Sequence, residues 1–258
     1  MARQKSIAGR CALCGEEGRL TFEHVPPEAA FNDERVMLAD IHQLLGSNRL
    51  LGDDGVQGRY QQRGAGAYTL CERCNNNTGA WYAREYVRFV HVVFPLALSV
   101  PTGESISFSF PFKPLPLLKQ IATMFCSACG PSFADAQPAI RRFILNREER
   151  GLPPKLSFHL GLFDVHSSKA SRQSGITGRL TGQHMEVFSE ISFPPLNAVM
   201  SCEGGPPDGR LYDITWFSRY DLREQTQVLF KLYNLPVNSY FPGDYRTRAE
   251  IVRQAKEP

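Results

Sequence analysis

The first hundred residues alternate between short apolar segments and long polar stretches, and this pattern predicts two strands followed by a helix. The strand-like segments are LTFEH at 20–24 and AYTL at 67–70. The stretch at 50–66 is rich in glycine and charge and has no apolar period, which predicts a mobile surface loop. The predicted helix is capped by Thr78 and broken at Pro95. Its apolar stripe repeats every three or four residues and consists of Trp81, Tyr82, Tyr86, Phe89, Val90 and Val93.

Beyond residue 98 the pattern changes from helical spacing to alternation. In SISFSFPF at 105–112, apolar residues from Ile106 onward alternate with serines, which is the period of a half-buried strand. A helix with Pro114 or Pro116 in its first turn is predicted next and ends at Gly130. The small module at 1–98 is therefore expected to be followed by a second unit.

The rest of the chain is predicted to be rich in strands. A short helix is expected over 138–150, and strands are expected at 156–163, 175–181, 184–193 and 196–202. Two helices are predicted to close the chain, over 222–233 and from near Tyr245. Together these elements predict an α+β fold, with residues 99–258 forming a strand-rich α+β domain of unassigned role.

Length and composition describe a globular protein and exclude several classes. The chain has 258 residues, 42% hydrophobic and 21% charged, with a formal net charge of +3. This balance excludes a disordered, collagen-like or coiled-coil chain. Its uncharged stretches are shorter than the ~20 apolar residues that cross a bilayer, so no membrane partner is expected. An odd number of cysteines, seven, and a start without an apolar signal segment predict a cytoplasmic location.

Two of the three C-x-x-C pairs predict a zinc site. These pairs are Cys11 with Cys14, and Cys71 with Cys74. Two residues between ligands let one turn direct both sulfurs at one ion, and four such sulfurs make a closed tetrahedral zinc site. The 56 residues between the pairs exceed the spacing of a simple zinc ribbon, so the ion would tie a long insertion into one unit. The alternative is that these are unrelated core cysteines, which requires the C-x-x-C spacing to have arisen twice by chance.

The third pair, Cys126 and Cys129, lies at the end of a predicted apolar helix. A second metal would need two further ligands from Cys202 or scattered histidines, in no known spacing. Core thiols are therefore the favoured interpretation.

A carboxylate, an imidazole and an amide stand next to the predicted zinc site in sequence. Glu23 and His24 end the first strand ahead of two prolines, and Asn75 directly follows the last cysteine. Neighbours on a strand point to opposite sides, so Glu23 can bind a metal from one direction while His24 addresses a water from another. The cysteine pair before Asn75 would hold that amide rigidly.

At these residues the chain resembles the HNH endonuclease superfamily, also called ββα-metal or His-Me finger nucleases. The likeness is to its four-cysteine zinc members, which include phage recombination endonucleases. Their pattern is C-x-x-C, then a strand with carboxylate-His-x-x-Pro, then C-x-x-C followed by Asn or His and a helix. This chain reads CALCG, EHVPP and LCERCN in that order, and the resemblance covers about the first 95 residues.

The resemblance implies an N-terminal ββα-metal finger stabilised by structural Zn²⁺ on the four cysteines. It also implies that Glu23 and Asn75 bind one catalytic divalent ion and that His24 is the general base. The chain would then be a metal-dependent endonuclease that hydrolyses phosphodiester bonds in nucleic acid, with DNA as the expected partner. One departure is that the asparagine that often precedes the second cysteine pair is absent; Asn48 is a remote candidate for its role.

The residue types suit this chemistry independently of the resemblance. An imidazole titrates near neutral pH and can activate water. A divalent ion relieves charge on the phosphoryl group and on the leaving oxygen. One carboxylate and one amide offer only oxygen ligands, which favours Mg²⁺ or Mn²⁺.

Four arginines are candidates for phosphate contacts. Arg59 and Arg63 lie in the glycine-rich loop, and Arg84 and Arg88 are one turn apart on the predicted helix. Contacts of this type position nucleic acid without reading its sequence. For each arginine, solvated charge is an equally good interpretation.

Two competing hypotheses remain open. One is a zinc-dependent module that binds nucleic acid or protein without catalysis, and the other is an unmetallated α+β protein with reduced cysteines. The sequence also leaves the oligomeric state open, with a homodimer as one option. The basic run of Arg141, Arg142, Arg147 and Arg150 is interpreted as a solvated helix face, and Asp164 with His166 as a strand end rather than part of a catalytic triad.

Overall fold

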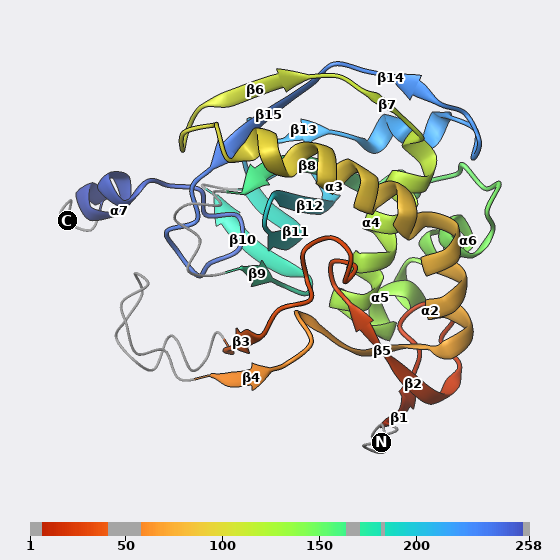
Figure 1. Ribbon diagram of the computed structural model, residues 1–258. Helices are drawn as coiled ribbons and strands as arrows, with labels where there is room; N and C mark the ends of the chain where they lie inside the picture. Colours follow the sequence, from red (N-terminus) through yellow and green to blue (C-terminus); the bar gives the residue numbers. More distant parts are fainter. Residues whose placement is uncertain (1–6, 41–57, 164–170, 182–183, 255–258) are drawn as a thin grey trace.

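The computed structural model describes residues 7–40, 58–163, 171–181 and 184–254, and shows a mixed α+β fold (Figure 1). The predicted fold class is therefore confirmed. Within the described residues, no helix has both the length and the apolar character needed to cross a membrane.

The N-terminal part is built on a three-stranded antiparallel sheet with the order β1-β2-β5. Its strands are β1 (Ile7–Arg10), β2 (Glu17–His24) and β5 (Gly66–Cys71). The strands predicted at 20–24 and 67–70 are thus present. A two-stranded ribbon, β3 (Val36–Leu38) with β4 (Arg59–Gln61), lies between them in sequence and was not predicted. Strand β4 occupies part of the expected loop at 50–66, of which residues 50–57 lie outside the described ones.

The helix after β5 begins earlier and ends later than its sequence signals indicate. It consists of α2 (Glu72–Thr78), a π-helical turn η1 (Gly79–Ala83) and α3 (Arg84–Ala97). Thr78 is not the cap: its hydroxyl donates to the Cys74 carbonyl within α2. The helix starts at Glu72 because Cys71 ends the strand in an extended conformation. Pro95 lies in the last turn of α3, so it does not stop the helix before Ala97.

The larger part contains an eight-stranded sheet with the order β10-β11-β12-β8-β15-β6, with β13 paired to β8 and β9 to β11. The strands are β6 (Ser105–Phe108), β8 (Ser157–Phe163), β9 (Arg172–Gln173), β10 (Thr177–Thr181), β11 (His184–Phe193), β12 (Leu196–Glu203), β13 (Tyr212–Asp213) and β15 (Phe230–Leu235). The four strands predicted between 156 and 202 are all present. A separate pair, β7 (Pro111–Phe112) with β14 (Thr226–Gln227), flanks the sheet.

The helix predicted at 222–233 is wrong, because this segment forms β14 and β15 instead. Around Phe230 and Leu232, buried residues alternate with exposed ones, which is the period of a strand. β15 runs parallel to β8 and antiparallel to β6, so it is held from both sides. The second closing helix exists as α7 (Arg248–Gln254).

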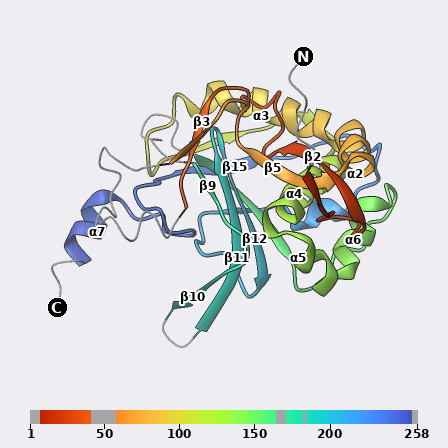
Figure 2. The same ribbon diagram turned by 90° about the horizontal axis from the view of Figure 1, so that it is seen from below.

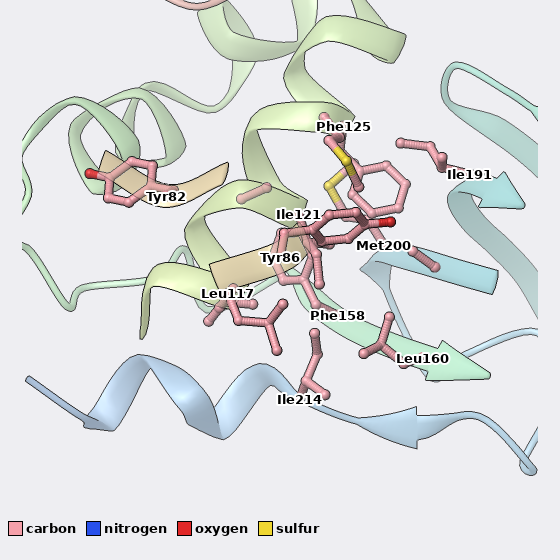
Figure 3. Close-up of a cluster of buried hydrophobic side chains, with 14 of the residues drawn as sticks. Tyr82, Tyr86, Leu117, Ile121, Phe125, Phe158, Leu160, Ile191, Met200 and Ile214 are labelled. Carbon is pink, nitrogen blue, oxygen red and sulfur yellow. The ribbon is translucent and has the colours of Figure 1, made fainter. Parts of the chain in front are cut away.

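The helix α4 (Pro114–Cys129) lies at the centre of the molecule and is buried on all sides from Pro114 to Ser127, rather than along one stripe. It packs against α3 and β5 of the N-terminal part and against β11 and β12 of the large sheet. Figure 2 shows it beside the small sheet, and Figure 3 shows its side chains in one hydrophobic cluster with Tyr86 of α3 and Phe158 of β8. Residues on both sides of position 98 therefore share one hydrophobic core. Separate roles for 1–98 and 99–258 stay a prediction.

Two short helices and a 3-10 turn complete the chain. They are α5 (Pro131–Ala136), α6 (Pro138–Leu145) and η2 (Thr215–Arg219). The helix α6 ends at Leu145, earlier than the predicted Arg150, because its last carbonyls are taken by side chains. Lys119 donates to the Phe143 and Asn146 carbonyls at 2.6 and 2.7 Å, and Tyr82 donates to the Ile144 carbonyl at 2.8 Å.

Candidate metal centre and adjoining site

The four cysteines predicted to bind zinc lie together. Cys11 and Cys14 stand in the β1–β2 turn, Cys71 ends β5, and Cys74 lies in α2; their sulfurs are all within 4.8 Å of one another. A Zn–S distance of about 2.3 Å in a tetrahedron places sulfurs about 3.8 Å apart. The Cys14 and Cys71 sulfurs are 3.8 Å apart, and none of the four is in a disulfide. The group could therefore hold a metal ion such as zinc.

The backbone of the first knuckle, residues 11–16, fixes the positions of these sulfurs. Gly15 has a φ of +78°, a conformation that glycine adopts without strain, and its N–H donates to the Cys11 carbonyl at 2.9 Å. The Cys71 N–H donates to the Cys11 sulfur at 3.3 Å, which joins the two cysteine pairs. Strand pairing and turn geometry thus bring the pairs together across 56 intervening residues.

Three of the four thiols have pKa values shifted from the ordinary value, in different directions. A hydrogen bond from the Cys74 thiol lowers the pKa of Cys11 to about 4, and the same interaction raises the pKa of Cys74. Burial raises the pKa of Cys14. Cys11 thus forms a thiolate readily, whereas Cys14 and Cys74 need a cation beside them to lose their protons.

Glu23 is a buried carboxylate on β2 that has no charged partner. Its side chain is 7% exposed, and none of the described residues forms an ion pair or hydrogen bond with its carboxylate. Burial raises the pKa of Glu23 to about 8. A buried carboxylate is stable as an anion only beside a cation, so the position favours a proton or a metal ion.

A β-bulge on β5 lies opposite the part of β2 that leads to Glu23. The β2–β5 register shifts between Thr21 and Phe22, which pair with Leu70 and Tyr68, so Thr69 is the extra residue on β5. On β2, Leu20 and Glu23 are buried, while Thr21, Phe22 and His24 are half-buried.

Asn75 is bonded to the same strand from α2. Its Nδ2 donates to the Thr21 hydroxyl and to the Phe22 carbonyl, both at 3.1 Å. A backbone carbonyl only accepts, so this contact fixes the orientation of the amide. Oδ1 accepts no hydrogen bond from the described residues, and an amide oxygen is a ligand suited to Mg²⁺ or Mn²⁺. Asn75 is thereby held against the residue that precedes Glu23.

His24 stands at the end of β2. Its ring meets the Phe22 ring edge to face, with centroids 4.9 Å apart. Nε2 is buried and has no hydrogen-bond partner in the described chain.

Asn32 is a site residue that the sequence did not indicate. Its side chain is 1% exposed; Nδ2 donates to the Pro26 and Ala65 carbonyls at 2.6 and 2.8 Å, and Oδ1 accepts the Ala65 N–H at 2.6 Å. The Val25 N–H also donates to the Ala65 carbonyl. Asn32 thus ties the segment after His24 to the start of β5. Nothing in the local sequence marks it, because its partners are distant in the chain.

The four predicted nucleic-acid-binding arginines lie on two parts of the surface. Arg59 is on β4 and Arg63 in the turn after it, while Arg84 and Arg88 are exposed on α3. Arg88 pairs with Glu85 at 3.3 Å. The structure adds Arg35, which stacks on the Tyr60 ring at 3.6 Å beside Arg59.

The remaining thiols do not form a second metal-binding group. Among the described residues, the four-cysteine group is the one cluster of three or more suitable ligands. Burial raises the pKa of Cys129 to about 12 and of Cys202 to about 11, which makes both thiols unreactive. Asn48, Asp164 and His166 lie outside the described residues.

Comparison with models of protein families, with curated proteins and with solved structures finds no match. The geometry and chemistry of the site therefore carry the functional argument.

Proposed function

We propose that the protein is a metal-dependent endonuclease of the HNH type, which hydrolyses phosphodiester bonds in nucleic acid, with DNA as its expected substrate. The arrangement of Glu23, His24 and Asn75 beside the four-cysteine group carries this proposal. The Asn75 amide is fixed in orientation and is bonded to the strand that bears Glu23 and His24. Within the described residues, its oxygen, the buried Glu23 carboxylate and the His24 Nε2 have no hydrogen-bond partner.

Each residue has a separate role in the proposed reaction. The cysteines hold structural Zn²⁺, which fixes the start of α2 against β2. Glu23 and the Asn75 oxygen hold one Mg²⁺ or Mn²⁺. A bound ion of this type supplies charge neutralisation at the phosphoryl and leaving oxygens. His24 accepts the proton of the attacking water, a task suited to an imidazole near neutral pH.

We expect substrate binding to depend on a few arginines near the site rather than on the net charge of the protein. A net charge of +3 over 258 residues gives little bulk attraction to a phosphate backbone. Arg59, Arg63, Arg84 and Arg88 are the proposed phosphate contacts, and all four are exposed.

A non-catalytic zinc module that binds nucleic acid or protein is the second candidate. One observation favours it: the two hydrogen bonds of Asn75 pin α2 to β2, which is a sufficient structural role for this amide. In that case Glu23 stays protonated inside the fold and binds no ion.

Binding of Mn²⁺ separates the two candidates. Zinc-loaded protein is titrated with Mn²⁺, and binding is followed by electron paramagnetic resonance. The nuclease proposal expects a single Mn²⁺ site that is lost in Glu23→Gln and weakened in Asn75→Ala. Exposed neighbours provide the matched controls, since Glu28→Gln and Asn76→Ala should bind Mn²⁺ like the wild type. A wild-type chain that keeps zinc and binds no Mn²⁺ supports the non-catalytic module.

A further inference from the structure

Two arginines hold the first cysteine knuckle, one from a distant part of the chain and one from the strand that leads into it. Arg141, on α6, donates from Nε to the Leu13 carbonyl at 2.7 Å. Arg10, at the end of β1, donates from Nε to the Gly15 carbonyl at 2.9 Å. Both acceptors are backbone carbonyls of the knuckle, one just before Cys14 and the other just after it. The two guanidinium groups thus hold the turn that positions the Cys14 sulfur.

Asp135 holds the two arginines in place. Its carboxylate pairs with Arg10 through Nη1 at 2.5 Å and Nη2 at 3.0 Å, and it accepts from Arg141 Nη2 at 2.8 Å. The hydrogen bond from Arg141 lowers the pKa of Asp135, so the carboxylate is charged at neutral pH. Arg141 thus brings α6 into direct contact with the knuckle, and Asp135 links α5 to it through the two arginines.

The fit at the knuckle is close. A Cβ atom on Gly15 would come within 2.9 Å of Arg141 Nη2. The side chain of Arg141 is 26% exposed, compared with 67% for its neighbour Arg142, which points away to Glu149. Exposed ion pairs alone contribute little to stability, but these arginines also hydrogen-bond the backbone around a metal ligand.

The charges also suit a metal centre. Zn²⁺ with four thiolates carries a net charge of −2, and two guanidinium groups with one carboxylate add a net +1 beside it. Arg73 of α2 also lies near Cys14, but it pairs with Glu16 at 2.9 Å and so adds no net charge. Groups that orient and neutralise metal ligands in this way change metal affinity by about 10–100-fold when they are removed.

We propose that Asp135 and Arg141 are positioning residues of the metal centre, through which the chain beyond residue 98 controls how firmly the four cysteines retain zinc. Arg10 completes this clamp, defined here as Arg10, Asp135 and Arg141. The inference rests on the zinc assignment proposed above and is independent of nuclease activity.

The rate of zinc release tests the clamp. Full-length zinc-loaded protein is mixed with excess chelator, and released zinc is followed with a colour indicator. Asp135→Asn and Arg141→Gln should release zinc about tenfold faster than the wild type. Arg142→Gln is the matched control and should release zinc at the wild-type rate. Because Asp135→Asn keeps the size of the side chain, circular dichroism can establish that the fold is intact even if Arg141→Gln folds poorly.

Wild-type release rates in both clamp variants would overturn the proposal. A wild-type chain that contains no zinc by elemental analysis would overturn both the clamp and the metal centre. A chain that keeps zinc, loses it faster in Asp135→Asn and cuts no nucleic acid would support the clamp while contradicting the nuclease.

Discussion

Asn32 joins the two backbone segments on either side of His24. Its three side-chain hydrogen bonds reach Pro26 and Ala65, and its side chain is buried. The structure therefore gives Asn32 a positioning role toward His24, because its hydrogen bonds hold the backbone that follows the imidazole.

Replacing Asn32 by alanine should lower the free energy of unfolding by about 3 kcal/mol, since each of three hydrogen bonds contributes about 1 kcal/mol. Urea unfolding of zinc-loaded protein measures this change. Asn76→Ala, at an exposed position, serves as the control. A change below about 0.5 kcal/mol in Asn32→Ala would show that these bonds are replaced by others.

Individual site residues were predictable where they belong to a local motif. The cysteine pairs, Glu23, His24 and Asn75 could be singled out because spacing along the chain indicates their chemistry. Asn32 and Arg141 could not, since each acts on backbone that is far away in sequence. The bulge at Thr69, on β5 opposite Thr21 and Phe22, also has no local signature.

Helices and strands were predictable where the apolar residues follow a single spacing along the chain. The strands between 156 and 202 and the boundaries of α4 follow from alternation and from Gly130. The segment 222–233 was misassigned because its apolar residues fit both a helix and a strand. Its pairing with β8 and β6 decides the outcome, and this is a contact between distant segments.

Lys119 on α4 makes the stability of the α4–α6 contact depend on pH. Burial lowers the pKa of Lys119 to about 8. Between pH 8 and about 10.5 the folded state thus binds fewer protons than the unfolded state, so the free energy of unfolding rises with pH in this window.

We expect the wild type to gain about 2 kcal/mol relative to Lys119→Met between pH 7.5 and 10. Urea unfolding of both proteins at the two pH values measures the difference. A constant difference across this range would mean that Lys119 keeps an ordinary pKa, with its three carbonyl contacts offsetting burial.

The larger hydrophobic cluster couples the metal centre to residues on both sides of position 98. Buried residues from Cys11 to Leu232 belong to one cluster, and the clamp adds polar contacts between α6 and the first knuckle. Loss of zinc should therefore destabilise both parts together rather than only the first 98 residues.

Scanning calorimetry with and without a chelator tests this coupling. We expect one transition whose midpoint falls by about 10 °C when zinc is removed, since a tightly bound ligand adds about 4 kcal/mol. Cys71→Ser should behave like the metal-free protein with or without the chelator. Two separate transitions, with only one sensitive to zinc, would contradict a shared core.

The central claim is that His24 activates water for phosphodiester hydrolysis. Wild type and His24→Ala, purified identically with zinc bound, are incubated with plasmid and linear DNA in the presence of Mg²⁺ or Mn²⁺. The proposed mechanism predicts that the wild type cuts DNA only with the added ion, and that His24→Ala is at least about 100-fold slower. Cleavage at the same rate in His24→Ala would contradict the claim.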